Sequence, residues 1–468
     1  MTIPLPSISL PRVWRDQNTQ LWLRLLIVTG VLVLSTYLAP RASQRHLILL
    51  LGAGMAAVFL RWPPLGLATL IVASLVVPFA VGTGTQTSLN ATVLLLPLLL
   101  GLWVLEMMRR KELRLLPSRP IPPLLALCGV AVLAFAAGNL PWFLFAQTAP
   151  LRAQLGGLAV FLLSAGAFLL VAHQVRDLRW LQALTWLFLA LGGFYMVGPL
   201  APELGRFTGR LFQHGATGSL FWTWLVAVAF SQAVFNRKLH LLWRLALAGL
   251  ALATLYVGLF QGRSWASGWL PPLAAMAAVL WAGAPRLGAP VGLVAGPVFA
   301  FGWQRIIAVV MSNQEYSFMT RLEAWRIIGE IIKANPLLGL GPANYYYYTP
   351  LFPILGYYVV FSSHNQYVDL VAQTGLLGLA CFLWFAWEVG RLGWRLRARV
   401  TEGFAQAYVY GALGGLVGTL AAGMLADWIL PFVYNIGLAG FRASVLGWIF
   451  LGGLVALEHM TTPHEERS

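Results

Sequence analysis

A histidine at the edge of an apolar segment is the first candidate for proton-transfer chemistry. The stretch FSSHNQYVDLVAQTGLLGL starts at Phe361 with polar residues and becomes an apolar run after His364. An imidazole titrates near neutral pH and can act as a general base or acid. A histidine at such a position is also commonly a solvated or capping residue, so both interpretations stay open on local grounds. Asp369 follows five residues later and could orient the ring.

Arginines near the ends of apolar segments form the second group of candidates. Arginine stays charged and binds phosphate in a bidentate geometry, so a set of arginines suits an anionic substrate such as a phosphate or diphosphate. Charged residues at the ends of membrane spans are costly to bury and are often functional. The candidates are Arg206 and Arg210 in GRFTGRLFQHGATG, Arg263 in LFQGRSWASGWL, and Arg321 and Arg326 in FMTRLEAWRIIGEIIK.

Each candidate also has a plain structural alternative. Arg206 could simply reach towards lipid headgroups, and Arg326 could pair with Glu323 on a solvated helix face. Arg263 has little loop from which to reach water, and the small residues around it would let helices approach closely, so its guanidinium is expected to point into a cavity. The run of four tyrosines that starts at Tyr345 could form an interfacial belt or stack on sugars.

The composition indicates that these residues are carried by membrane-spanning helices. The chain has 468 residues, of which 59% are hydrophobic and 10% charged, and its mean hydropathy is +0.75. Soluble domains carry about 25% charged residues, so a water-soluble core cannot absorb this apolar surface. Near-continuous apolar runs of about 17–23 residues indicate helices, and the alternation typical of membrane β-barrels is absent. The predicted fold class is all-α, a polytopic membrane bundle of about fourteen transmembrane helices.

The basic residues predict the orientation of this bundle. The expected spans are 21–39, 46–61, 63–81, 89–108, 121–138, 156–173, 180–199, 218–235, 244–260, 267–283, 290–311, 365–388, 404–426 and 442–458. With the N-terminus inside, most lysines and arginines fall in cytoplasmic loops, which satisfies the positive-inside rule. The net charge of +16 is then explained by these loops and by anionic lipid headgroups, rather than by nucleic acid.

The expected domain organisation follows from these spans. The predicted segments are a cytoplasmic N-terminal segment (1–20), a membrane bundle of about eleven spans (21–311), a long extracytoplasmic loop (312–363), about three further spans (364–458) and a cytoplasmic tail (459–468). The loop is too long for a simple connection, and it contains its own helical pattern. Apolar residues at helical spacing there are Leu322, Trp325, Ile328 and Ile332. An amphipathic helix on the outer face, ending at Asn335–Pro336, is expected.

Several familiar kinds of catalytic site are absent from the sequence. It contains no HExxH, GxSxG, Walker or Cys/His zinc spacing. Cys128 and Cys381 both fall inside apolar runs and indicate neither a disulfide nor a metal site. No metal and no cofactor are therefore expected.

Two stretches in and after the long loop resemble the signature region of the O-antigen ligase/polymerase family. They are TRLEAWRIIGEIIKANPLLGLGPANYY and SSHNQYVDLVAQTGLLGLACFLW, and the turn LFQGRSWASGWL is also similar. The matching residues are Arg321, Trp325, Pro336, Gly339, Gly341, Asn344, His364, Asn365 and the Gly375–Gly378 pair. The resemblance is most specific over about 210–390.

The resemblance implies a GT-C-like glycosyltransferase of the bacterial inner membrane, and the distribution of basic residues predicts that both termini are cytoplasmic. Such an enzyme takes a glycan from undecaprenyl diphosphate on the extracytoplasmic face and passes it to lipid A core, to another glycan or to a protein. It is implied to be inverting and metal-independent. Membrane lipids are its other partners.

The resemblance also implies roles for individual residues. His364 and Arg263 would be catalytic, with His364 acting on the acceptor hydroxyl as a base or assisting the leaving diphosphate. Arg210 would bind the diphosphate together with Arg263, and Arg321 would help to place donor or acceptor. The remaining candidates for substrate binding are Arg206, His214, Arg326, Tyr345 and Asn365. His214 belongs to the sequence QHGATG, which departs from the Asn-Pro-Asn-like turn of many relatives, and Gln373 replaces a common acidic residue.

Two other classes of function compete with the enzyme. A flippase for lipid-linked oligosaccharides would carry basic residues through the depth of its central cavity, whereas the candidates here cluster on one side of the membrane. A scaffold role gives no reason for Arg263.

Overall fold

The computed structural model describes residues 44–82, 88–112, 114–212, 215–286 and 315–461. The chain divides into two compact units, residues 1–61 and residues 62–468. The first unit contains the described helix α2 (Gln44–Arg61). The spans expected at 21–39 and 290–311, and the candidate His214, lie outside the described residues.

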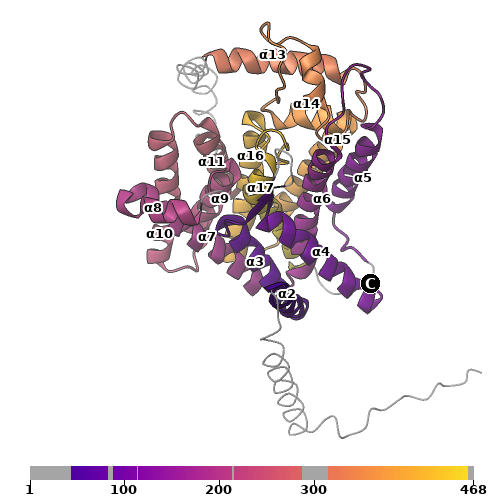
Figure 1. Cartoon of the computed structure of the whole chain (residues 1–468). Coiled ribbons are helices and arrows are strands. Elements are labelled where there is room, and N and C mark those ends of the chain that lie inside the picture. Colours follow the sequence, from indigo (N-terminus) through magenta and orange to yellow (C-terminus); the bar gives the residue numbers. More distant parts are fainter. Residues whose placement is uncertain (1–43, 83–87, 113, 213–214, 287–314, 462–468) are drawn as a thin grey trace, which may run out of the picture. The chain divides into compact units, whose positions relative to one another are not determined.

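The second unit is helical, which confirms the predicted all-α class (Figure 1). Its helices are α3 (Pro63–Leu75), α4 (Ala91–Arg110), α5 (Ile121–Ala137), α6 (Leu151–Gln174), α7 (Leu178–Leu200), α8 (Pro202–Leu211), α9 (Ser219–Phe235), α10 (Leu241–Tyr256), η3 (Val257–Gln261), α11 (Ala266–Gly283), α13 (Glu315–Ile332), α14 (Tyr345–Tyr348), η4 (Thr349–Leu351), α15 (Gln366–Leu396), α16 (Phe404–Leu425) and α17 (Gly437–Thr461). Two short antiparallel strands, β1 (Ala80–Gly82) and β2 (Ser88–Asn90), pair between α3 and α4.

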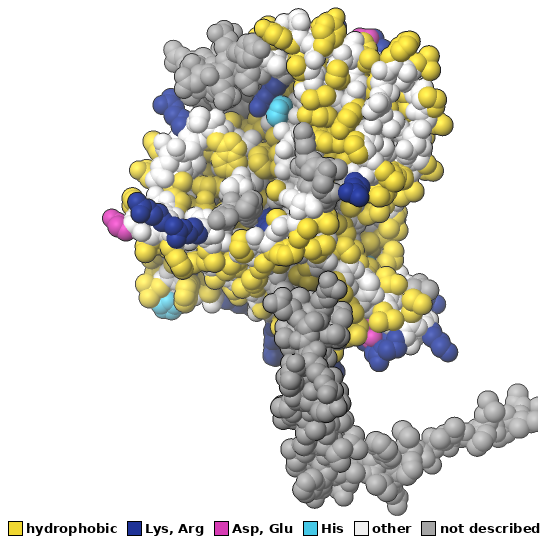
Figure 2. Space-filling view, in the orientation of Figure 1, with side chains coloured by type: hydrophobic (Ala, Val, Ile, Leu, Met, Phe, Trp, Pro, Cys, Tyr) yellow, Lys and Arg dark blue, Asp and Glu magenta, His cyan; other side chains and the backbone are white. Residues whose placement is uncertain are grey.

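The chain is a multi-pass membrane protein. Among the described residues, eight helices are long and apolar enough to cross a bilayer, and the figure of about fourteen spans stays a prediction. Large apolar side chains are widely exposed, for example Leu245 (59%) and Trp387 (66%), and they dominate the face shown in Figure 2. Such an exposed apolar surface is stable against lipid and not against water.

Helix α17 forms the centre of the bundle. It packs against α6 and α9, while α16 packs against α9 and α11. Gly452 lets α17 approach α6 closely, because a Cβ atom there would lie 2.5 Å from the Phe168 carbonyl oxygen. Near its N-terminal end α17 carries the buried Arg442, which donates hydrogen bonds to the carbonyl oxygens of Val77 (2.5 Å) and Phe79 (2.8 Å). This arginine fastens the segment after α3 to α17.

Helix α15 is broken at Gly375, and the long loop pairs with the break. Gly375 has φ +68° and ψ −173°, a conformation that is open almost only to glycine. The break frees backbone groups on both sides. The Leu340 N–H donates to the Ala372 carbonyl (2.9 Å), and the Leu376 N–H donates to the Pro336 carbonyl (2.9 Å). The irregular backbone is thus satisfied by protein and not by water, as membrane depth requires.

Two glycines of the loop permit this pairing. Gly339 and Gly341 have φ of +68° and +85°. A Cβ atom on Gly339 would lie 2.6 Å from the Gly375 nitrogen, and one on Gly341 would lie 2.8 Å from the Gly138 Cα. The loop therefore lies backbone to backbone against α15 and against the end of α5.

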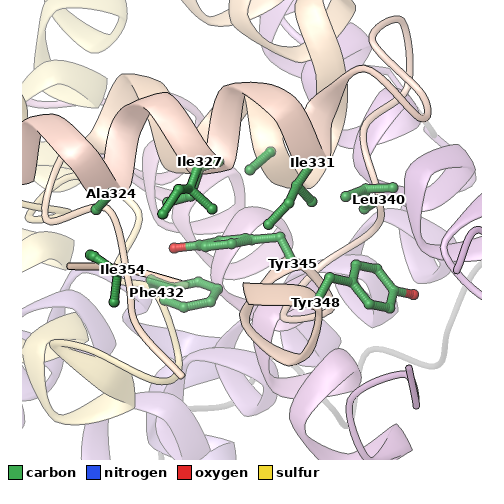
Figure 3. Packing of buried hydrophobic residues seen from close by; sticks show 10 residues of the cluster. Ala324, Ile327, Ile331, Leu340, Tyr345, Tyr348, Ile354 and Phe432 are labelled. Atoms are coloured by element: carbon green, nitrogen blue, oxygen red, sulfur yellow. The ribbon is translucent and has the colours of Figure 1, made fainter. Parts of the chain in front are cut away.

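Helix α13 covers this end of the unit and packs on an aromatic cluster (Figure 3). Its buried side chains are Ala324, Ile327, Ile328 and Ile331. They enclose Tyr345, whose ring stacks on Phe432 with centroids 4.8 Å apart. Leu322, which was predicted to lie in the apolar stripe, is 41% exposed. The buried face of α13 is instead formed by Ala324, Ile327, Ile328 and Ile331.

We predict that Gly375→Ala lowers the free energy of unfolding by at least about 2 kcal/mol, from backbone strain and overlap. A Cβ atom at this position would lie 2.1 Å from the Leu337 carbonyl oxygen. The measurement is the melting transition of the full chain in detergent. The matched control is Gly390→Ala on the same helix, where the nearest atom would be 3.6 Å away. Equal melting temperatures for the two variants would contradict the pairing.

Candidate active site

His364 lies immediately before α15 in a left-handed backbone conformation. Its φ is +49°, which is uncommon for a residue with a side chain and is characteristic of functional or tightly constrained positions. Asn365 is the N-cap of α15 and accepts hydrogen bonds from the N–H groups of Tyr367 (2.9 Å) and Val368 (3.3 Å). Asn365 also donates to the Met424 carbonyl (3.3 Å). The residue after His364 is thereby fixed.

The residue before His364 is fixed from two other elements. The Trp325 indole N–H of α13 donates to the Ser363 carbonyl (2.7 Å). The Ser363 N–H donates to the Tyr345 hydroxyl of α14 (3.3 Å), and its side chain bonds to the backbone of Asn365. The backbone of His364 is therefore held by α13, α14 and α15 together, which explains how its unusual φ is maintained.

A buried tyrosine–carboxylate pair supports this arrangement. The Tyr345 hydroxyl donates to Asp369, and both side chains have no exposed surface. Burial, followed by the adjacent Asp369 carboxyl, raises the pKa of Tyr345 well above its usual value, so the phenol stays protonated. Burial also raises the pKa of Asp369 well above its usual value. The second oxygen of Asp369 has no hydrogen-bond partner among the described residues.

The segment between α16 and α17 is bonded to the start of α15. The Gln366 side-chain oxygen accepts from the N–H groups of Ile429 (3.0 Å) and Leu430 (2.8 Å). Asp427 accepts from the Phe432 N–H (2.6 Å) and from the Asn435 side chain. Burial raises the pKa of Asp427 to about 6, so this carboxyl titrates just below neutral pH.

The electrostatic partner of His364 is Arg321 on α13. Burial lowers the pKa of His364, and the positive charge of Arg321 lowers it further. Burial also lowers the pKa of Arg321. Because an arginine titrates far above neutral pH, Arg321 remains charged. At pH 7 the pair is therefore a neutral imidazole beside a partly buried guanidinium, which can accept a proton and bind an anion.

The other predicted arginines lie on different elements. Arg206 and Arg210 are exposed on α8, which packs on α7. Arg263 is exposed in the turn between η3 and α11. Within the described chain, none of the three forms a hydrogen bond or an ion pair with His364. Arg326 is exposed and pairs with Glu323 (2.7 Å).

The structure brings together residues that the sequence considered separately. Arg321, Tyr345, His364 and Asn365 all belong to one constellation, with Asp369 as the hydroxyl acceptor of Tyr345 rather than a partner of the imidazole. The supporting roles of Gln366 and Trp325 were missed. Gln366 is a polar residue at the start of an apolar run, and this position would have indicated that its side chain has a role. Among the described residues, no three His, Cys, Asp or Glu side chains lie close enough to share a metal ion.

We predict that Tyr345→Phe destabilises the protein by about 1–3 kcal/mol, because the buried Asp369 and the Ser363 N–H lose their partner. Tyr348→Phe is the matched control, since Tyr348 is equally buried and no hydrogen bond of its hydroxyl is found within the described residues. Melting temperatures of the two purified variants give the comparison. A smaller loss for Tyr345→Phe than for Tyr348→Phe would refute the supporting role.

The comparisons with known proteins give a family match for part of the chain. Residues 219–383 match the family model described as O-antigen ligase. The matched region runs from α9 into α15 and includes Arg263, Arg321 and His364, whereas α8 lies outside it. The comparison with curated proteins finds no match. Residues 219–383 are therefore similar to the O-antigen ligase family over the part of the chain that carries His364 and Arg321.

Proposed function

We propose that the protein transfers a glycan from undecaprenyl diphosphate to an acceptor on the extracytoplasmic face of the bacterial inner membrane. The observation that carries the proposal is the pair formed by a neutral His364 and the charged Arg321 inside an O-antigen ligase domain. The acceptor is lipid A core in a ligase, or another glycan in a repeat-unit polymerase; a protein is the third option. The flippase is not favoured, because the matched family is a ligase.

In the proposed reaction, the acceptor hydroxyl attacks the anomeric carbon of the donor sugar. His364 accepts the hydroxyl proton as the new glycosidic bond forms. The bond from the anomeric carbon to the diphosphate oxygen breaks, and its electron pair leaves with the diphosphate. A single displacement of this kind inverts the anomeric configuration. No metal is required, because cationic side chains neutralise the leaving group.

Arginines supply the electrostatic part of this mechanism. Arg321 stabilises the negative charge that develops on the diphosphate while it keeps His364 unprotonated. Arg210 on α8 and Arg263 in the turn before α11 bind the diphosphate in this proposal, and Arg206 assists them. Preorganised charges of this kind generally contribute more than the base when the leaving group is already good. Both termini lie in the cytoplasm in this proposal.

We predict that His364→Ala abolishes glycan transfer, with a loss of at least about 100-fold from the missing base. Protein level and membrane insertion should stay normal, because the side chain is only half-buried. Transfer from the purified lipid-linked donor is the measurement. Lys333→Ala is the control, since this exposed lysine lies just after α13 and pairs only with Glu330 among the described residues. Full activity of the His364 variant would exclude the base.

The pH dependence gives a second prediction. His364 must be neutral to accept a proton. We therefore expect kcat/KM to be independent of pH around pH 7 and to fall as the pH drops below 6.5, the ordinary pKa of an imidazole. Arg321→Gln removes the nearby positive charge, which raises the pKa of His364. The acid limb of the residual activity should therefore move to higher pH. An unchanged acid limb would show that Arg321 does not act on His364.

Gene deletion followed by glycan analysis of the cell envelope separates ligase from polymerase. Loss of all capping on lipid A identifies a ligase, and single-repeat glycans identify a polymerase.

A further inference from the structure

A second pocket lies where α6, α15 and α17 end. It encloses about 1400 Å³. Its lining comes from the connections between α4 and α5, between α6 and α7, and between α15 and α16, together with the last turns of α17. Helix α15 starts directly after His364 and ends beside this pocket. The pocket therefore lies at the opposite end of α15 from the candidate active site, and none of its residues has a role in the proposed transfer.

Hydrogen bonds between separate segments hold the walls of the pocket in place. The Leu116 N–H donates to the Nε2 atom of His173 on α6 (2.8 Å), and the Nδ1 atom of the same ring lies 2.7 Å from the Leu169 carbonyl oxygen. Nε2 therefore accepts and Nδ1 donates, as in a neutral imidazole. The Ser118 hydroxyl donates to Glu458 near the end of α17 (2.6 Å). The connection between α4 and α5 is thus attached to both α6 and α17.

Two arginines line this pocket without a counter-charge. Arg176 follows α6, and its Nε–H donates to the His173 carbonyl oxygen (3.4 Å). Arg399 lies in the turn between α15 and α16. Neither guanidinium forms an ion pair with any residue that the structure describes, and both residues are exposed. Most of their N–H groups are therefore available to a ligand.

The acidic residues of the lining are engaged by other groups. Asp177 is the N-cap of α7 and accepts from the Arg179 N–H (2.9 Å). Glu458 accepts from Ser118 and lies 3.7 Å from the Arg395 guanidinium. The charge of Glu458 is therefore balanced by Arg395, and the pocket keeps an excess of positive charge.

This lining suits a phosphate group attached to an apolar molecule. A guanidinium can donate two parallel hydrogen bonds to phosphate oxygens, and two guanidinium groups face one pocket here. Other parts of the lining are apolar, for example Leu116, Leu178 and Met460. In the orientation predicted from the basic residues, this end of the bundle faces the cytoplasm, where the adjacent leaflet contains anionic phospholipids.

We propose that this pocket is a binding site for a phosphate-bearing anion, which Arg176 and Arg399 hold. The headgroup of an anionic phospholipid is one source of this chemistry, and a soluble phosphate compound is the other. A bound phosphate would link the connection between α6 and α7 to the connection between α15 and α16. The proposal is independent of glycan transfer, because it uses none of the residues assigned to that reaction.

The first test measures binding of phosphatidylglycerol to the purified full-length protein in detergent by native mass spectrometry. Phosphatidylcholine, which has no net charge, is the reference lipid. We expect the double variant Arg176→Ala/Arg399→Ala to bind phosphatidylglycerol about tenfold more weakly, because its charge-assisted hydrogen bonds are lost. The matched control is Arg237→Ala/Arg286→Ala, which removes two exposed arginines outside the pocket.

Inorganic phosphate is the probe for the soluble source, and its binding is measured by calorimetry on the same proteins. Loss of phosphatidylglycerol binding in the pocket variant alone assigns the site to a lipid headgroup. Loss of inorganic phosphate binding in the pocket variant alone assigns it to a soluble phosphate compound. The proposal is overturned if the pocket variant binds both probes as the wild type does, or if the control variant loses binding equally.

Melting temperatures show whether a variant loses binding only because it is poorly folded. Without added probe, both double variants should melt like the wild type, since the arginines they replace are exposed. The probe that binds should raise the melting temperature of the wild type and the control but not of the pocket variant, because a ligand of the folded state stabilises it. An equal rise in all three proteins would also overturn the proposal. If the double variant melts lower, Arg399→Ala alone replaces it in both tests.

Discussion

The break in α15 is the constraint on which the positions of α13, α14 and His364 depend. At Gly375 the helix gives up part of its regular hydrogen bonding, and the loop segment 336–341 supplies the missing partners. Backbone groups inside a membrane protein must be paired, so the break and the loop can only exist together. This pairing anchors the long loop on the bundle. It thereby determines where α13 and α14 lie, and with them the surroundings of His364.

The glycines and asparagines of the signature region serve this anchoring. Gly339 and Gly341 permit the close backbone approach. The Asn344 side chain donates to the Gly138 carbonyl (2.9 Å) and accepts from the Ala149 N–H (3.0 Å), so it joins the loop to the connection between α5 and α6. Asn365 caps α15. Most residues of the signature region therefore have a structural role. Only a few of them are candidates for a catalytic role.

Hydrogen bonds to the residues on both sides of His364 fix the position of its backbone. Tyr345 accepts from the N–H group of Ser363, Trp325 donates to its carbonyl group, and Asn365 caps the helix that follows. A side chain placed between two fixed peptides loses little freedom when substrate binds, which is the usual requirement for efficient catalysis. In the proposed mechanism this geometry presents a neutral imidazole beside a cation.

The sequence by itself determined that the chain is a helical membrane protein, because no water-soluble core could absorb its apolar residues. It also determined where most described helices lie, since apolar runs of span length leave few alternatives. It identified His364 and Arg321 as candidates, because polar residues at the ends of such runs are few. Only the tertiary structure decided that these two are partners, since the segment 333–365 between α13 and α15 follows a path that depends on the break at Gly375. Tyr345 illustrates the same limit. Its place in a run of four tyrosines suggested an interfacial belt or sugar stacking, whereas contacts with Asp369 and Phe432, both distant in sequence, place it in the core.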